Sequence, residues 1–374
     1  MKKGNRRWMR WAPFSWVILM CIAHGCSHEI RKPSNLMDTP GHHVYTGMRL
    51  LEEGLLANAT REFDLALELD PEHSPAFQGK GIVLAMQGDF KRGFDAMGYA
   101  KKHAKGGREK GMAHVGYMQV YTMEKGKGWL KKVEDHYKDA MSAGGTTPDA
   151  CFAMGMAFKE DFQLEKAAVQ FRRVLSLDGG LVTRADDQLR QVQKIQRAIP
   201  GTEIGKRMAF REKVTRAEVS ALLLHELRID RFLKKKEGQG DPGRGVPGDV
   251  KDHPLRADIE LILALGIRGL DVYPDHTFRP DAPLARAMHA MAVEDLLAAI
   301  TNDRHLSTAF LDSISPFQDV RSDAPFFNAI MVCLSRGLME PADARLPRFN
   351  PGGPVSGADV LLAIRKLKEE LRAL

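Results

Sequence analysis

Two internal repeats of different length divide this sequence, and they constrain its fold more than any other feature. The first half repeats every 34 residues, starting with a set that contains Gly47, Ala59 and Phe63. The second half repeats about every 70 residues, as the recurrence of Asp249 at Asp319 illustrates. Because one repeat unit cannot bury its apolar face alone, neighbouring units must stack and share a core. The sequence therefore predicts two repeat domains.

The 34-residue repeat places small and large apolar residues at fixed positions. Small residues fall where two helices must approach closely, and large apolar residues fill the space between helix pairs. Six extra residues separate the second and third copies, and they lie in the Lys- and Gly-rich stretch 101–111, which predicts a loop. The third copy is the weakest. The four copies are Gly47, Leu50, Gly54, Ala59, Phe63, Ala66 and Pro71; Gly81, Leu84, Gly88, Gly93, Met97 and Ala100; Tyr121, Gly128, Val133, Tyr137 and Ala140; and Gly155, Phe158, Ala167, Phe171 and Val174.

These spacings resemble the tetratricopeptide repeat, a family in which each unit forms a pair of helices. The resemblance covers residues 40–181, and 182–199 read as a polar amphipathic helix that caps this solenoid or joins the next domain. It implies a groove that binds a protein partner, and the Met-rich groove positions favour an amphipathic helix or an apolar peptide. Alternatively, these side chains pack among themselves or against the helix after residue 182. The groove positions are Val44, Met48, Leu51, Gln78, Ile82, Met118, Thr122, Phe152 and Met156.

Each unit of the longer repeat has an Asp-Val start, an amphipathic helix, a loop, and a short motif that opens a second helix. The motif VTRA at 214–217 aligns with LARA at 284–287, seventy residues later. Thr215 is suited to cap the helix that follows, with Glu218 three residues on, as a capping box requires. The pattern predicts three similar helical units in the second half of the chain.

These units resemble the S-layer homology domain. The resemblance rests on FRPDAPLARA at 278–287, VTRAE at 214–218 and the unit start FQDV at 317–320. It implies a helical spindle of three units, with grooves that bind cell-wall polysaccharide, often through an acidic pyruvyl group, or a peptidoglycan-linked polymer. The spindle would occupy 200–374, with units at about 200–235, 249–300 and 317–374.

The resemblance also implies which residues bind the glycan. In the family, the Arg of each TRAE-like motif and the neighbouring loop make the contacts. An Arg guanidinium suits an acidic sugar because its planar fork pairs with a carboxylate through two hydrogen bonds. The candidate residues are therefore Arg216, Arg286, Tyr273, Asp275 and Arg279.

Each unit departs from the family pattern. Gly357 replaces the Arg in the third unit, so its groove should lack the basic residue and changes to its motif should matter little. Met288 stands where the motif of the second unit has Glu, and the first unit has no clear Asp-Val start. As an alternative to glycan binding, Arg216 and Arg286 only bridge acids or carbonyls between units.

The first 25 residues have the pattern of a secretory signal peptide. Five basic residues in the first ten precede the uncharged, mostly apolar stretch 11–23, which is too short to span a membrane. Cys26 follows Ala-His-Gly, which resembles the lipobox of bacterial lipoproteins and implies a lipid on Cys26. By the same resemblance, Ser27 implies the outer membrane, with 26–39 as a polar tether. Alternatively, Cys26 is incidental in a plain signal peptide.

Charge and motifs exclude several other classes of function. The net charge of +7 depends on the N-terminus, since the rest of the chain has 50 basic and 48 acidic residues. A chain so nearly neutral has no global electrostatic reason to bind nucleic acid. Cys151 and Cys333 lie in apolar helical patterns and read as core residues. No nucleophile-base pair, metal motif or phosphate-binding loop stands out, so neither catalysis, a metal nor a cofactor is expected.

Together these features predict an all-α envelope lipoprotein, with a tetratricopeptide helical-hairpin solenoid followed by a three-unit S-layer homology spindle. It would be lipid-anchored on the periplasmic side of the outer membrane and act as a non-enzymatic tether or scaffold. The solenoid would hold a protein partner, and the spindle would bind an acidic wall polysaccharide. The alternative is an accessory lipoprotein for pilus, secretion or outer-membrane assembly, in which the spindle is a degenerate protein-binding module.

Overall fold

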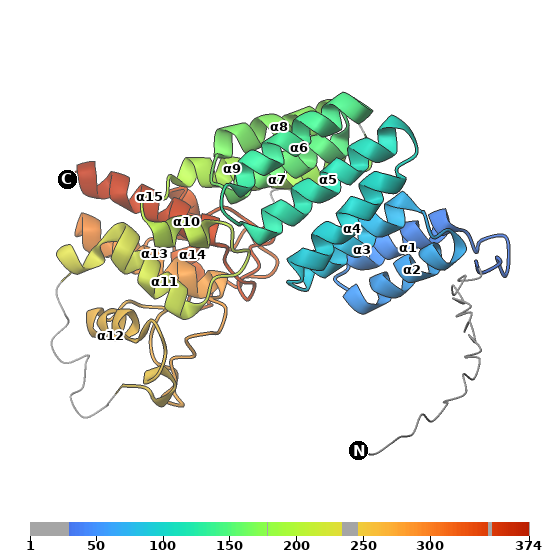
Figure 1. The fold of residues 1–374 in the computed structure, drawn as a ribbon. Helices are drawn as coiled ribbons and strands as arrows, with labels where there is room; N and C mark the ends of the chain where they lie inside the picture. The colour runs from blue at the N-terminus through green and yellow to red at the C-terminus, as the bar shows by residue number, and fades with distance from the viewer. Residues whose placement is uncertain (1–29, 178, 234–245, 343–345, 374) are drawn as a thin grey trace, which may run out of the picture.

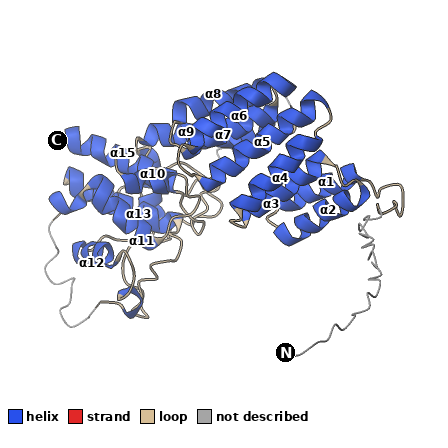
Figure 2. Cartoon of the chain, in the orientation of Figure 1, coloured by secondary structure: helices blue, strands red, loops and turns tan. Residues whose placement is uncertain are grey.

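The structure of this chain is all helical. The computed structural model describes residues 30–177, 179–233, 246–342 and 346–373. Within these residues it has fifteen α-helices and two isolated β-bridges (Figures 1 and 2). The predicted all-α fold class is confirmed. None of these helices is long and apolar enough to cross a membrane. The predicted signal peptide and the lipid site at Cys26 lie outside the described residues.

The first eight helices form four hairpins that stack into a solenoid (Figure 1). The fully buried ring of Phe63 shows why small residues recur, because a Cβ on Gly47 would lie 2.7 Å from it. Phe171 repeats this arrangement with Gly155 in the last hairpin, at the same distance of 2.7 Å. The hairpins are compatible with tetratricopeptide-like repeats. They comprise α1 (Pro40–Glu52) and α2 (Leu56–Leu69), α3 (Ser74–Met86) and α4 (Phe90–His103), α5 (Gly106–Glu124) and α6 (Trp129–Gly144), and α7 (Pro148–Glu160) and α8 (Leu164–Leu177).

The third hairpin differs from the sequence prediction. The loop predicted over 101–111 is wrong, because α4 runs to His103 and α5 begins at Gly106. The extra residues instead lengthen α5 to 19 residues, against 13 in α1, α3 and α7. A Cβ on Gly107 would overlap the carbonyl oxygen of Ala143 in α6. The glycines of this stretch therefore allow two helices to touch. A prediction from composition alone takes the same glycines as the mark of a loop.

The segment before α1 is also more ordered than a tether would be. The backbone N–H of Arg31 donates to the carbonyl of Glu68 in α2 at 3.0 Å. The buried Asp38 carboxylate accepts two hydrogen bonds from the Arg31 guanidinium, both at 2.7 Å, and contacts His43 at 2.9 Å. These hydrogen bonds, led by the Arg31 pair, hold the pKa of Asp38 far below its usual value. Residues 30–39 of the predicted tether thus dock on the first hairpin.

Helix α9 (Val182–Ala198) joins the two halves of the chain. It packs against α8 on one side and against α15 (Gly357–Ala373) on the other. Lys194 of α9 forms an ion pair with Asp359 of α15. A hydrophobic cluster runs without a break from Val115 in α5 to Leu367 in α15. The helix predicted over 182–199 therefore connects the repeat domains through a shared core.

The second half of the chain closes on itself through a ring of backbone hydrogen bonds. Val214 donates to the carbonyl of Val355 at 3.1 Å, Leu284 donates to Val214 at 2.9 Å, and Val355 donates to Leu284 at 3.0 Å. The three residues are 70 and 71 positions apart, so three repeat units meet around a pseudo-threefold axis. The helices of this domain are α10 (Glu203–Ala209), α11 (Arg216–Leu222), α12 (Arg256–Leu265), α13 (Arg286–Thr301), α14 (Phe327–Ser335) and α15.

A second ring places the three motif positions in equivalent environments. The backbone N–H groups of Arg216, Arg286 and Gly357 each donate to a carbonyl of another unit. Gly357 therefore occupies the same structural position as the two arginines. The pairs are Arg216 with Ala282 at 3.0 Å, Arg286 with Gly353 at 2.8 Å, and Gly357 with Arg211 at 2.8 Å.

Candidate functional site

Arg216 begins α11 and points into the core of the C-terminal domain. Thr215 caps this helix, and Glu218 completes the predicted capping box. The Arg216 side chain is 1% exposed, and each of its three nitrogens donates to a carbonyl. Burial lowers the pKa of this guanidinium. The acceptors are the carbonyls of Phe278 at 2.7 Å, Gly269 at 3.1 Å and Asp271 at 2.6 Å.

The structure brings the predicted loop residues together above Arg216. The Tyr273 ring centroid lies 4.8 Å from the Arg216 guanidinium carbon and 4.2 Å from that of Arg279. Arg279 also pairs with Asp275 at 2.7 Å. Four of the five predicted glycan-binding residues are therefore neighbours. Here the loop covers the buried arginine, and the exposed side chains are those of Asp275 and Arg279.

Arg286 occupies the equivalent position at the start of α13 but keeps one donor unused. Its Nε donates to the carbonyl of Phe349 at 2.9 Å, and its Nη2 donates to that of Glu340 at 2.6 Å. Its Nη1 has no hydrogen-bond partner in the part of the chain that the structure describes. Arg286 lines a cavity of about 210 Å³. A ligand with an acceptor oxygen can therefore reach an arginine that is itself 8% exposed.

Tyr273 covers Arg216, whereas Arg286 borders a cavity. The carbonyls of Asp271 and Glu340 accept the same hydrogen bond in the two units. Two residues after Asp271, Tyr273 stacks over Arg216, and two residues after Glu340 stands Ala342, which has no ring.

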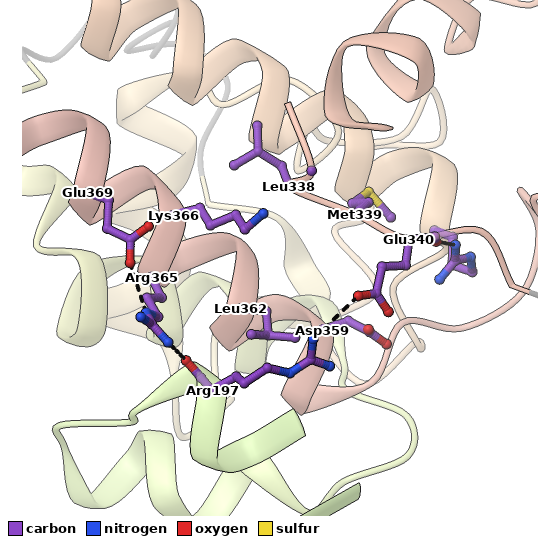
Figure 3. Close-up of a pocket in the computed structure, with 11 residues that line it drawn as sticks. Arg197, Leu338, Met339, Glu340, Asp359, Leu362, Arg365, Lys366 and Glu369 are labelled. Carbon is purple, nitrogen blue, oxygen red and sulfur yellow. Dashed lines mark hydrogen bonds and ion pairs between the residues drawn. The ribbon is translucent and has the colours of Figure 1, made fainter. Parts of the chain in front are cut away.

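The cavity beside Arg286 is lined by side chains from three parts of the fold (Figure 3). Arg197 comes from the end of α9, and Arg365 and Lys366 come from α15. Arg365 donates to Glu369 at 2.9 Å and to the carbonyl of Arg197, so it is already held in place. No ion pair to Lys366 occurs within the described ranges. Lys366, Nη1 of Arg286 and Arg197, whose ion pair with Glu340 spans 3.9 Å, are thus the cationic groups that an anionic ligand could meet. Glu340, Asp359 and Glu369 line the same cavity.

These cavity cations were missed by the sequence reasoning. Arg197 lies in the connecting helix, outside the predicted spindle, and Lys366 lies in the last helix, outside any recognised motif. The positions of Arg197 and Lys366 along their helices are typical of ordinary solvent-exposed residues. Only the packing of α9 against α15 brings them to the same cavity as Arg286.

The third motif position is closed by backbone. A Cβ on Gly357 would overlap the carbonyl oxygen of Met208 in α10 and lie 2.7 Å from its carbon. The end of α10 thus occupies the space that an arginine fills in the other units. The expectation that changes at this motif matter little for glycan binding stays a prediction, but the structure adds that even a methyl group at Gly357 has no room.

The predicted partner groove is only partly presented at the surface of the solenoid. Gln78, Ile82 and Met118 are 7%, 4% and 0% exposed, so they belong to the interior. Thr122 and Met156 line a cavity of about 520 Å³ together with Met86 and Met123, where α3, α5 and α7 meet. The remaining groove positions are half-buried: Val44, Met48, Leu51 and Phe152.

Comparison with known families agrees with this description of the last unit. Residues 316–361 match the S-layer homology domain. The matched segment contains α14 and the start of α15, and with them Gly337 and Glu340 of the cavity. No curated protein matches the chain significantly. The domain indicates a role at the cell surface or cell wall.

A buried histidine one turn after Arg286 makes the stability of this domain sensitive to acid. His289 is 0% exposed, and its two ring nitrogens have no hydrogen-bond partner among the described residues. Burial lowers its pKa from 6.5 to about 4. Above pH 6.5 the His289 ring is neutral in both the folded and the unfolded chain. Below pH 6.5 the ring takes up a proton in the unfolded chain, whereas in the folded chain it stays neutral down to about pH 4.

We expect the free energy of unfolding to fall by about 3 kcal/mol between pH 7 and 4 on account of His289 alone, at about 1.4 kcal/mol per pKa unit. His289→Leu should lack this component, because Leu fills the site without a titratable group. Urea unfolding of both proteins at the two pH values measures the difference. Equal acid sensitivity in the two proteins would show that His289 does not titrate in this range.

Proposed function

We propose that the C-terminal domain binds an acidic polymer of the cell wall in the cavity beside Arg286. The observation that carries this proposal is the unused Nη1 donor of Arg286, a residue that lines the same cavity as Lys366. A carboxylate, such as a pyruvyl group on a sugar, can accept from both donors. The match of residues 316–361 to the S-layer homology domain supports a wall polymer as the source of that carboxylate.

In this proposal, fewer of the motif residues contact the ligand than the family resemblance implies. Arg286 is the motif arginine that contacts the ligand, with Lys366 and Arg197 beside it. Arg216 serves mainly to hold the loop that carries Tyr273, and any ligand at that unit would meet Arg279 and Asp275 at the surface. Because Arg197 belongs to α9, a ligand in this cavity also touches the helix that joins the solenoid to the spindle.

In the same proposal, the rest of the chain binds a protein partner and anchors the protein to a membrane. Residues 40–181 form tetratricopeptide repeats that bind a protein partner, and Cys26 carries a lipid that anchors the chain to the outer membrane, facing the periplasm. The protein is then a non-enzymatic tether between membrane, partner and wall. The apolar cavity lined by Met86, Met123 and Met156 supports an apolar peptide or helix as the partner.

A second function is favoured by that same apolar cavity. The chain would be an assembly accessory for pilus, secretion or outer-membrane machinery, acting through the solenoid, and the spindle would bind protein only. The two functions differ in one respect that can be measured. A wall-binding protein must recognise the secondary polymer, whereas an accessory scaffold need not.

Cosedimentation with cell-wall sacculi separates these functions. The full chain without its signal peptide should sediment with sacculi that retain their secondary polymers. It should remain in solution with sacculi stripped of those polymers by acid. Equal sedimentation with both preparations, or with neither, would contradict polymer binding and favour the accessory role.

A further inference from the structure

Two histidines and an aspartate meet in the third hairpin, far from the cavity beside Arg286. His114 lies on α5, and His136 and Asp139 lie on α6. The Nδ1 atoms of the two histidines are 2.8 Å apart, and Nδ1 of His114 is 3.5 Å from a carboxylate oxygen of Asp139. One ligand atom from each of the three residues falls within 4.8 Å of the other two. These are the nitrogen and oxygen donors that bind divalent transition metals.

The two imidazole rings face each other through their Nδ1 atoms. Two neutral rings that face each other through Nδ1 can share one proton, or both can turn lone pairs toward a cation.

We propose that His114, His136 and Asp139 bind a zinc-like divalent metal ion. Ligands held about 2.0 Å from a tetrahedral zinc ion lie about 3.3 Å from each other. Two of the three present separations, 2.8 and 3.5 Å, lie on either side of that value, and the third is within 4.8 Å, so the side chains must move to close around an ion. Three protein ligands leave a fourth position for water, and the exposed Asp139 side chain opens that position to solvent.

The residues around the three candidate metal ligands fix the orientation of His136 and carry charges of both signs. The ring of Tyr117 stacks on His136 with a centroid distance of 4.6 Å and an interplanar angle of 4°. This contact fixes the orientation of the His136 ring. Lys101 of α4 is the nearby cation that opposes a metal, and Asp135 adds a negative charge beside Asp139.

A metal at this position would join the two helices of the third hairpin. This hairpin carries the weakest copy of the 34-residue repeat, and its first helix is the one that is lengthened. A bond from His114 to a metal shared with His136 and Asp139 connects α5 to α6 directly. The ion would thus stabilise the one repeat that departs most from the pattern of the others.

Isothermal titration of the full, tag-free chain with Zn²⁺ at pH 7.5 tests this proposal. We expect one site, with affinity reduced about tenfold or more in His136→Gln and in Asp139→Asn. Asp139 is 59% exposed, so Asp139→Asn should fold like the wild type, as circular dichroism would verify. His42→Gln, on the exposed face of α1, is the matched control and should bind like the wild type.

Two results would overturn the proposal. The first is no saturable site in the wild type. The second is equal affinity in the wild type and Asp139→Asn, which would place Zn²⁺ on other histidines of the chain. In either case, His114 and His136 only share a proton.

Discussion

Replacing Arg216 with Met should lower the free energy of unfolding by about 3–5 kcal/mol, which is a large fraction of the stability of a typical domain. Methionine matches the length of the side chain but donates no hydrogen bond. The carbonyls of Phe278, Gly269 and Asp271 would then lose their partner, a side chain that is only 1% exposed. Each unpaired buried acceptor costs about 1–3 kcal/mol. Urea unfolding at pH 7 measures the loss.

The matched control is the same substitution at Arg286. That residue donates to two carbonyls and borders a cavity that admits water, so Arg286→Met should cost about half as much. If Arg216→Met instead changes stability by less than about 1 kcal/mol, the arginine is not needed by the loop. The residue would then be available to a ligand, as the sequence resemblance implies.

Gly357→Ala should destabilise the protein by about 3 kcal/mol, at the upper end of the cost of overpacking. The added methyl group meets the backbone carbonyl of Met208, which cannot rotate away as a side chain would. To make room, α15 or α10 must shift, and α15 also packs on α9. Thermal and urea unfolding report the change.

Gly352→Ala is the matched control for this substitution. It lies five residues earlier, and a Cβ there meets nothing within 4 Å. It should therefore unfold like the wild type. Comparable stability of Gly357→Ala and Gly352→Ala would contradict the close approach of α10 to the third motif.

The repeat spacing was enough to predict how the C-terminal units are related. Val214, Leu284 and Val355 are the first residues of the aligned motifs, and their backbone groups form the closing ring. Backbone hydrogen bonds depend on register, and register can be read from spacing. Composition was less informative in the solenoid, where Gly107 allows a helix contact and does not mark a loop.

The candidate site was predictable only in part. Arg216 and Arg286 look alike in sequence, yet one is covered by Tyr273 and the other faces a cavity. The Tyr273 ring contributes to this difference, and its effect depends on where the ring lies. Lys366 and Arg197 are brought to the cavity by packing between helices that lie far apart along the chain. No local pattern encodes such a contact.

The central claim is that the cavity beside Arg286 binds an acidic wall polymer. Its most direct test is cosedimentation of the double variant Lys366→Gln, Arg197→Gln with sacculi that retain their secondary polymers. Both side chains are at least partly solvent-accessible, and the ion pair of Arg197 with Glu340 is long, at 3.9 Å. A charge-assisted hydrogen bond contributes about 1.5–3 kcal/mol, so we expect affinity to fall about tenfold to a hundredfold. A control that removes the same charge elsewhere, Arg304→Gln with Arg321→Gln, should sediment like the wild type. If the two double variants sediment alike, the cavity beside Arg286 does not bind the polymer.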